Sequence, residues 1–209
     1  MPAAETAHLT KCYQAASVIL EYGSGGSTQL AAQMSGKLVF SVESDRDWAR
    51  NLRQQIAQAM PRSQVIVYHV DIGPTGPWGR PLDSSHWQRF HRFPNAIWDA
   101  PFFRHPDLVL IDGRFRTACL MATMLRIKHP VTVLFDDYAD RPRYHMVEQF
   151  LYPKRMIGRM AEFALVPGML RDADMGKVLA QFFEGSVHGK GKTSYALTPE
   201  QENVLRAIK

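Results

Sequence analysis

The sequence has few cysteines and no long hydrophobic run. Of its 209 residues only Cys12 and Cys119 are cysteines, far apart and without a CxxC spacing. This excludes a disulfide framework and gives no support to a cysteine-based zinc site, so both thiols are expected in the core. No segment reaches the roughly 20 apolar residues of a membrane span. Glu5, His8 and Lys11 interrupt any signal-peptide core, and a cytoplasmic protein is expected.

The composition fits a globular protein. Hydrophobic residues make up 45% of the chain and charged residues 22%, so residues 1–209 are predicted to form one domain around one core. The net charge is +5. Its excess lies in residues 61–130, which hold nine Lys or Arg against five Asp or Glu. This bias favours an anionic partner near that segment.

Apolar strands and amphipathic helices alternate along most of the sequence. Buried strands are expected at residues 17–22, 37–43, 64–70, 107–111 and 131–135. A first helix is expected at 28–35, and a second begins at a capping box of Ser44 and Asp47 and ends at Pro61. Further helices are expected at 117–128, 144–151, 175–183 and 198–208. The second helix carries Trp48, Leu52, Ile56 and Ala59 on its inward stripe. Residues 155–159 and 163–166 are predicted to be a final antiparallel pair. This order predicts an α/β fold, a Rossmann-like, mostly parallel sheet with helices on both faces and an antiparallel last strand.

An aromatic-rich insertion at about residues 72–106 separates the third strand from the fourth. It shows one plausible helix, at 84–90. Its aromatic residues are Trp78, Trp87, Phe90, Phe93, Trp98, Phe102 and Phe103, interleaved with Arg80, Arg89, Arg92 and Arg104. Three interpretations are open: a lid over a substrate, a packed insertion whose arginines are solvated, or a surface for single-stranded nucleic acid.

Every strand of the expected parallel sheet carries a carboxylate at its carboxyl end. These acids are Glu21, Glu43, Asp71, Asp112 and the pair Asp136 and Asp137. Ligands of such sheets bind at the carboxyl ends of the strands. The expected acidic rim suits a ligand with hydroxyls or a positive centre and suits a polyphosphate poorly.

A glycine loop follows the first strand. Gly23 and Gly25 match a dinucleotide fingerprint, whereas Thr28 stands where its third glycine belongs. Glu43 lies 20 positions after Gly23 (43 − 23 = 20), the spacing of an acid that binds ribose hydroxyls. These residues leave a dinucleotide and another nucleoside cofactor as alternatives.

With Glu21 two residues before Gly23, the chain resembles the class I S-adenosylmethionine-dependent methyltransferases over about residues 17–138. The resemblance implies that the glycine loop contacts the methionine part of the cofactor and that Glu21 supports the site around its amino group. It implies ribose contacts from Glu43. The cofactor-binding residues expected in all are Glu21, Tyr22, Gly23, Ser24, Gly25, Glu43, Ser44, Asp71, Ile72 and Asp112, with Asp71 and Ile72 bordering the adenine.

Asp112, Asp136 and Asp137 are the candidates for the reaction centre. Their layout resembles catechol-type O-methyltransferases, in which such acids hold a divalent cation, and oxygen ligands suit Mg²⁺. That family places a lysine base three residues after the first acid, where this chain has Phe115. The alternative is that Asp136 and Asp137 cap the sheet edge or orient substrate.

The expected function is methylation of an oxygen on a small molecule or sugar. Methylation of tRNA or rRNA, a nicotinamide-dependent oxidoreduction and a non-catalytic nucleoside-cofactor-binding protein are the alternatives.

Overall fold

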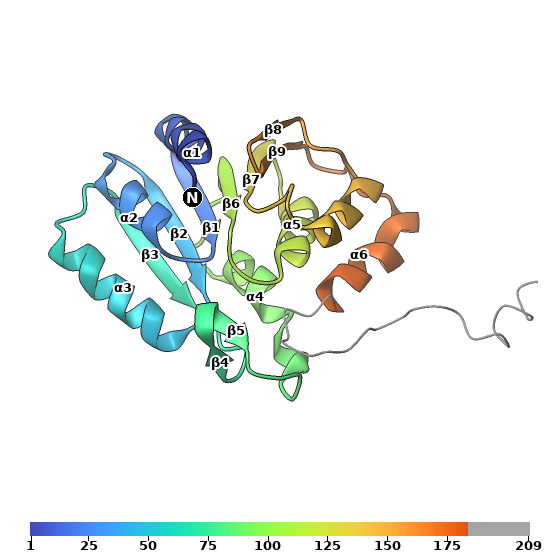
Figure 1. Ribbon diagram of the computed structural model, residues 1–209, viewed down its shortest axis with the longest axis horizontal. Coiled ribbons are helices and arrows are strands. Elements are labelled where there is room, and N and C mark those ends of the chain that lie inside the picture. Colours follow the sequence, from blue (N-terminus) through green and yellow to red (C-terminus); the bar gives the residue numbers. More distant parts are fainter. Residues whose placement is uncertain (184–209) are drawn as a thin grey trace, which may run out of the picture.

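A seven-stranded sheet forms the centre of the computed structural model, which describes residues 1–183 (Figure 1). Its strands are β1 (Val18–Tyr22), β2 (Leu38–Glu43), β3 (Gln64–His69), β6 (Leu108–Ile111), β7 (Val131–Phe135), β8 (Arg155–Ile157) and β9 (Met160–Leu165). They lie in the order β3-β2-β1-β6-β7-β9-β8. The first five are parallel, while β9 is antiparallel to both β7 and β8. This confirms the Rossmann-like fold and its antiparallel last strand.

Helices cover both faces of the sheet. They are α1 (Ala3–Ala15), α2 (Gly26–Gln33), α3 (Arg46–Gln58), α4 (Arg92–Asn95), α5 (Arg116–Arg126) and α6 (Met175–Phe183). Successive strand residues point to opposite faces. Ile19 therefore packs in the cluster that holds α1 and α2 residues, and Leu20 packs in the cluster that holds α5 and α6 residues. Both side chains are fully buried. Within residues 1–183, no helix is long and apolar enough to cross a membrane.

The sequence pattern did not predict α1. Its inward residues are Glu5, Leu9 and Tyr13, spaced four apart, and all three are buried. A charged residue at one of these positions obscures the apolar stripe. Glu5 is satisfied in the interior because its Oε1 accepts a hydrogen bond from the backbone amide of Arg159 at 3.0 Å.

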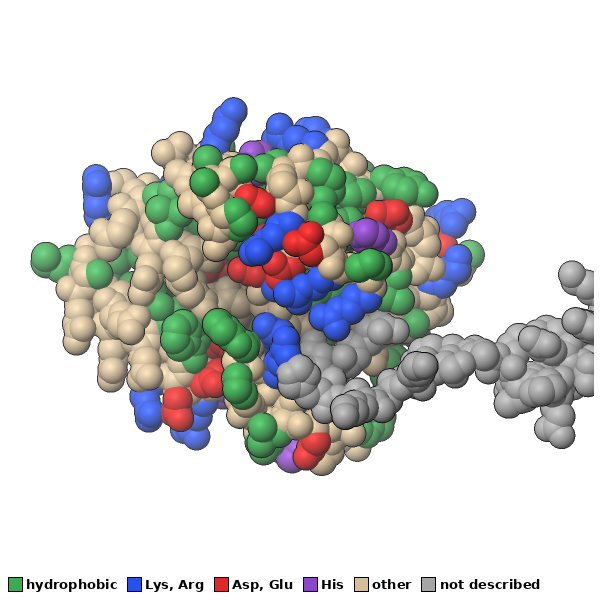
Figure 2. Space-filling view, viewed as in Figure 1, with side chains coloured by type: hydrophobic (Ala, Val, Ile, Leu, Met, Phe, Trp, Pro, Cys, Tyr) green, Lys and Arg blue, Asp and Glu red, His purple; other side chains and the backbone are tan. Residues whose placement is uncertain are grey.

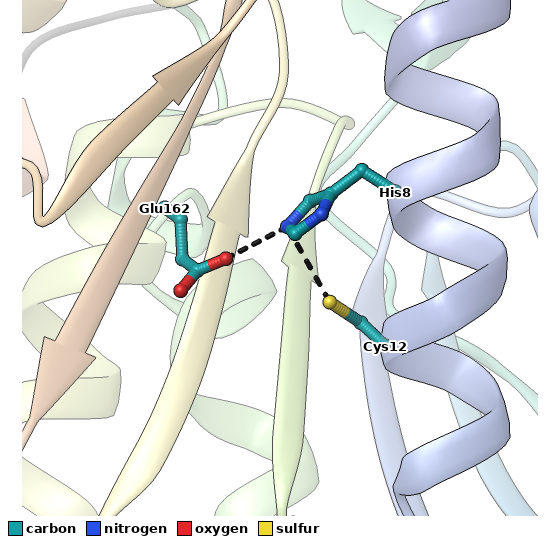
Figure 3. A group of neighbouring side chains, drawn as sticks. All are labelled: His8, Cys12 and Glu162. Carbon is teal, nitrogen blue, oxygen red and sulfur yellow. Dashed lines mark hydrogen bonds and ion pairs between the residues drawn. The ribbon is translucent and has the colours of Figure 1, made fainter.

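A polar clamp joins α1 to β9 (Figure 3). His8 Nε2 lies 2.7 Å from Glu162 Oε2 and 3.5 Å from Cys12 Sγ. Arg155 donates two further hydrogen bonds to the same Glu162 oxygen, at 2.9 and 2.8 Å. Cys12 is half-buried in this clamp, whereas Cys119 is fully buried. The expectation of a core thiol is therefore confirmed for Cys119 only.

The insertion does not contain the helix expected at 84–90. Asp83 Oδ1 accepts the amide of Ser85 at 2.8 Å and forms a turn there. Short elements follow one another instead: β4 (Thr75–Gly76), η1 (Pro77–Gly79), β5 (Arg80–Pro81), η2 (Trp87–Arg89), α4 and η3 (Ala96–Asp99). Phe90 and Phe93 are buried, with ring centroids 5.3 and 5.8 Å from that of Phe115. This part of the insertion is therefore a packed layer on the α5 side of the sheet.

Two other local expectations are wrong. Helix α3 is capped by Asp45 rather than Ser44, because Asp45 Oδ1 accepts the amide of Trp48 at 2.9 Å. The helix expected at 144–151 is a 3-10 segment, η4 (Pro142–Gln149). Another 3-10 segment, η5 (Asp172–Asp174), precedes α6. The helix expected at 198–208 lies outside the described residues.

Candidate functional site

A cavity of about 780 Å³ opens at the carboxyl ends of the central strands. The glycine loop after β1, the end of β2, the β4–β5 hairpin and the loops after β6 and β7 form its wall, together with residues of α1. Figure 2 shows acidic side chains surrounded by Lys and Arg at the centre of this face. The cavity lies where the chain order of the strands reverses, between β1 and β6, which is the position expected for a ligand of this fold.

Two glycines bring the ends of β1 and β6 into contact. Gly23 has a φ of +104°, and a Cβ on it would lie 2.7 Å from the Cα of Gly113. A Cβ on Gly113 would lie 2.8 Å from the carbonyl oxygen of Tyr22. Neither position accepts a side chain without moving a strand end. Gly25 and Gly26 instead have open space where a Cβ would be, and both line the cavity.

Glu21 supports the glycine loop from within the protein. Its side chain is fully buried. Its Oε1 accepts from Tyr13 Oη at 2.5 Å and its Oε2 from Thr28 Oγ1 at 2.5 Å. Thr28 Oγ1 accepts the amide of Gly25 at 3.0 Å. Burial raises the pKa of Glu21, and the hydrogen bonds from Thr28 and Tyr13 oppose that rise.

Glu43 lies on the cavity wall at the end of β2. Its Oε1 accepts the amides of Ser44 and Asp45 at 2.7 and 2.9 Å, and its Oε2 accepts the amide of Ser24 at 3.3 Å. Burial raises the pKa of Glu43, while these backbone amides lower it. The hairpin packs closely here, since a Cβ on Gly79 would lie 2.9 Å from Glu43 Oε1. The carboxylate is therefore fixed in orientation.

Two tryptophans line the same side of the cavity. Trp48 is 49% exposed, and its Nε1 donates to the Ser24 carbonyl at 2.9 Å. The prediction that it faces inward with Leu52 and Ile56 is wrong, because the buried stripe of α3 runs through Ala49, Leu52 and Ile56 and Trp48 lies beside that stripe. Trp78, on the hairpin, is 83% exposed and has a φ of +65°.

The predicted cofactor residues divide into two groups. Gly23, Ser24, Gly25, Glu43 and Asp112 line the cavity; Glu21, Tyr22, Ser44, Asp71 and Ile72 are not among its lining residues. Tyr22 and Ile72 are fully buried, and the Tyr22 hydroxyl donates to the Pro94 carbonyl at 2.7 Å. Asp71 is exposed and pairs with Arg89 at 2.9 Å.

The three candidate catalytic carboxylates do lie together. Oxygens of Asp112, Asp136 and Asp137 come within 4.8 Å of one another. Asp112 and Asp137 line the cavity. Asp136 is 1% exposed and lies behind them. The parallel pairing of β6 with β7 explains this meeting, since both strands end at the same edge.

Arginines neutralise this acidic cluster. Arg116 pairs with Asp112 at 2.9 Å and with Asp137 at 3.2 Å. Arg141 pairs with Asp137 at 2.7 Å. Arg159 pairs with Asp136 at 3.1 Å and with Asp137 at 3.0 Å. Three carboxylates thus face three guanidinium groups. This donor set does not fit Mg²⁺, because a cation would have to displace these arginines.

Arg116 joins the ends of β6 and β7. It is only 5% exposed, and it donates to the carbonyls of Asp112 at 2.9 Å and Asp136 at 2.5 Å. Sequence reasoning assigned it no role, although its position four residues after Asp112 at the start of a helix is a pairing signal. Burial raises the pKa of Asp112 to about 6; Arg116 opposes this rise, while Asp136 and Asp137 reinforce it.

Several solved structures share this fold. The chain is 47% identical to a methyltransferase-like protein from Silicibacter pomeroyi, over 87% of this chain and 95% of that one, with a TM-score of 0.81. The O-methyltransferase TomG from Streptomyces achromogenes, involved in tomaymycin synthesis and solved with S-adenosylmethionine, is 18% identical over 80% and 82%, with a TM-score of 0.53. A methyltransferase from Geobacter sulfurreducens is 10% identical over 79% and 80%, with a TM-score of 0.51. No family model and no curated protein matches the sequence.

The sheet order and the cavity beside the glycine loop define a Rossmann-like protein with a site at its topological switch point. The protein from Silicibacter pomeroyi, 47% identical over most of both chains, narrows the class of this chain further. The chain belongs to the class I S-adenosylmethionine-dependent methyltransferase superfamily.

Proposed function

We propose that the protein methylates an oxygen nucleophile of a small molecule, with S-adenosylmethionine as the methyl donor. The observation that carries this proposal is one continuous cavity. Its lining includes the glycine loop and Glu43 on one side and the half-buried Asp112 on the other. When bound, the cofactor supplies an activated methyl group on a sulfonium sulfur.

The residues on the β1 and β2 side fit a nucleoside cofactor with an amino-acid tail. The open positions at Gly25 and Gly26 allow close approach to the backbone. The first amides of α2 are donors for a carboxylate. Glu43, fixed by backbone amides, is an acceptor for ribose hydroxyls. Trp48 and Trp78 offer aromatic surface beside it.

Asp112 is our candidate for the general base. Arg116 holds its Oδ1 at 2.9 Å, and no ion pair within residues 1–183 uses its Oδ2. A carboxyl with a pKa of about 6 is largely ionised at neutral pH and can accept the hydroxyl proton of the acceptor. Asp136 and Asp137 act through Arg116 and Arg159, as positioning residues. No step is assigned to a metal ion.

Calorimetry tests the cofactor. We expect S-adenosylmethionine and S-adenosylhomocysteine to bind and to raise the melting temperature, and NAD to do neither, because a ligand of the folded state stabilises it. Binding of NAD alone would favour the oxidoreductase. Cofactor binding with no methyl transfer to any hydroxylated acceptor in a broad panel would favour the non-catalytic alternative.

Methylation of RNA is the second candidate. Trp78 and Trp87 are exposed on the insertion, but Phe90 and Phe93 belong to the core and are not available for base stacking. We therefore favour a small-molecule acceptor. Salt-dependent retention of tRNA in a filter-binding assay would reverse this preference.

A further inference from the structure

Arg114 is a cation in the cavity wall without a described partner. It follows Asp112 and Gly113 in the loop between β6 and α5, and it lines the cavity. Its Nε is buried and has no hydrogen-bond partner within the part of the chain that the structure describes. The ion pairs around the acidic cluster use Arg116, Arg141 and Arg159 instead. A buried donor without a partner destabilises the protein, and more so when it is charged.

The acidic side chains that line the cavity already have partners, whereas Arg114 has a buried donor without one among residues 1–183. Asp112 and Asp137 are neutralised by the arginines already described. On the opposite side, Glu43 is held by backbone amides and Asp45 caps α3. Arg114 therefore adds a positive charge at the β6 end of the cavity. Burial lowers the pKa of Arg114 to about 10, and the nearby charges of Arg116, Arg80 and Arg141 contribute to this lowering. The guanidinium therefore stays cationic at neutral pH.

The backbone fixes Arg114 in place. Phe115, the next residue, has a φ of +49°, a left-handed conformation that costs a non-glycine residue energy. Its ring is 3% exposed and packs against Phe90 and Phe93, which hold it there. Helix α5 begins one residue later, and the positive end of its dipole lies next to Arg114. This is a rigid, positively charged loop facing an open cavity.

We propose that Arg114 binds an anionic group, a carboxylate or a phosphate, on the methyl acceptor. This assignment rests on the proposed function. A guanidinium is the side chain best suited to bind either group in a bidentate manner. The acceptor would then carry its anion at Arg114 and its reacting hydroxyl near Asp112, two residues away.

The carboxylate of the cofactor is the competing ligand for Arg114. The glycine loop and the first amides of α2 already supply donors on the other side of the cavity. For that reason we assign Arg114 to the acceptor. The experiment must separate these two sources of the anion.

Binding of small probes to the full chain tests the proposal. Benzoate, phenyl phosphate and the neutral isostere benzamide are titrated by calorimetry, each with and without saturating S-adenosylhomocysteine. The variants are Arg114→Gln, Arg114→Lys and the control Arg104→Gln. Arg104 is an exposed arginine of the insertion outside the cavity lining. Circular dichroism and melting curves check that each variant folds.

We expect benzoate or phenyl phosphate to bind at least tenfold more tightly than benzamide. Arg114→Gln should abolish that difference, Arg114→Lys should keep part of it, and Arg104→Gln should keep all of it. S-adenosylhomocysteine should bind the wild type and Arg114→Gln equally. Whichever of the two anions binds more tightly identifies the group.

Three results would overturn the proposal. The first is equal binding of benzamide and both anions, and the second is anion binding that survives in Arg114→Gln. The third is a loss of S-adenosylhomocysteine affinity in Arg114→Gln as large as the loss of anion affinity, which would assign Arg114 to the cofactor. A wild type that binds no S-adenosylhomocysteine would refute the proposed function instead. The titrations without cofactor would then still decide whether Arg114 binds an anion.

Discussion

Tyr13 of α1 donates a hydrogen bond of 2.5 Å to Glu21, the acid next to the last residue of β1. The amino-terminal helix thus holds the residue that supports the glycine loop, and Thr28 of α2 holds it from the other side at 2.5 Å. The loop is positioned by helices that precede and follow it in the chain.

We expect Tyr13→Phe to destabilise the protein by about 1–3 kcal/mol, because it leaves a buried carboxylate with one donor fewer. S-adenosylhomocysteine should bind several-fold more weakly, because the loop loses part of its support. Urea unfolding and calorimetry measure the two effects. The double variant Tyr13→Phe/Glu21→Gln should lose less than the sum of the single variants. Strict additivity would show that the two residues act independently.

Gly113→Ala should destabilise the protein and weaken cofactor binding, since its methyl group would lie 2.8 Å from the Tyr22 carbonyl and 2.9 Å from Gly23. We expect a loss of about 1–3 kcal/mol, the usual range for overpacking. Gly176→Ala is the matched control. Gly176 lies in α6 with nothing within 4 Å of the added carbon. It should gain up to about 1 kcal/mol from helix propensity. Equal melting temperatures for Gly113→Ala and wild type would contradict the contact.

The sequence predicted the sheet well for a physical reason. Buried parallel strands need continuous apolar runs, and β7, for example, was predicted with the bounds that it has. The acids that end β6 and β7 were predicted to meet because parallel strands end at one edge, and Asp112 and Asp136 do meet.

The arginine network was not predictable in the same way. Arg159 comes from the turn between β8 and β9 and reaches Asp136 across the sheet, and no local spacing indicates such a pair. The insertion escaped prediction because its aromatic residues pack against distant partners such as Phe115 rather than along a helical stripe.

The methylation rate should rise with pH through about 6. Asp112 accepts a proton only as a carboxylate, and burial, which Arg116 opposes, sets its pKa at about 6. Asp112→Asn should lower kcat by about 10²–10⁴-fold, the usual contribution of a general base, and should remove this limb of the profile. Asp140→Asn, an exposed acid of the loop after β7, should change neither. A limb near pH 6 that persists in Asp112→Asn would assign the titration to another group.

Removal of divalent cations should leave the reaction intact. Arg116, Arg141 and Arg159 already neutralise the three carboxylates that could otherwise hold a cation. We expect the rate after EDTA treatment to stay within about twofold of the rate in Mg²⁺-containing buffer. Loss of activity in EDTA with recovery on adding Mg²⁺, but not Na⁺, would establish a metal requirement.

The clamp between α1 and β9 should make stability depend on pH. Burial would raise the pKa of Glu162, but the hydrogen bonds from Arg155 and His8 outweigh it and lower this pKa. A lowered folded-state pKa gives stability that is present above the unfolded value of about 4.3 and is lost as the pH falls. Glu162→Gln should therefore cost on the order of 1–3 kcal/mol at pH 7, and should cost progressively less in acid. Urea titrations of wild type and Glu162→Gln between pH 7 and pH 3 measure this convergence. A cost that stays constant over that range would mean that packing, rather than the carboxylate charge, holds α1 to the sheet.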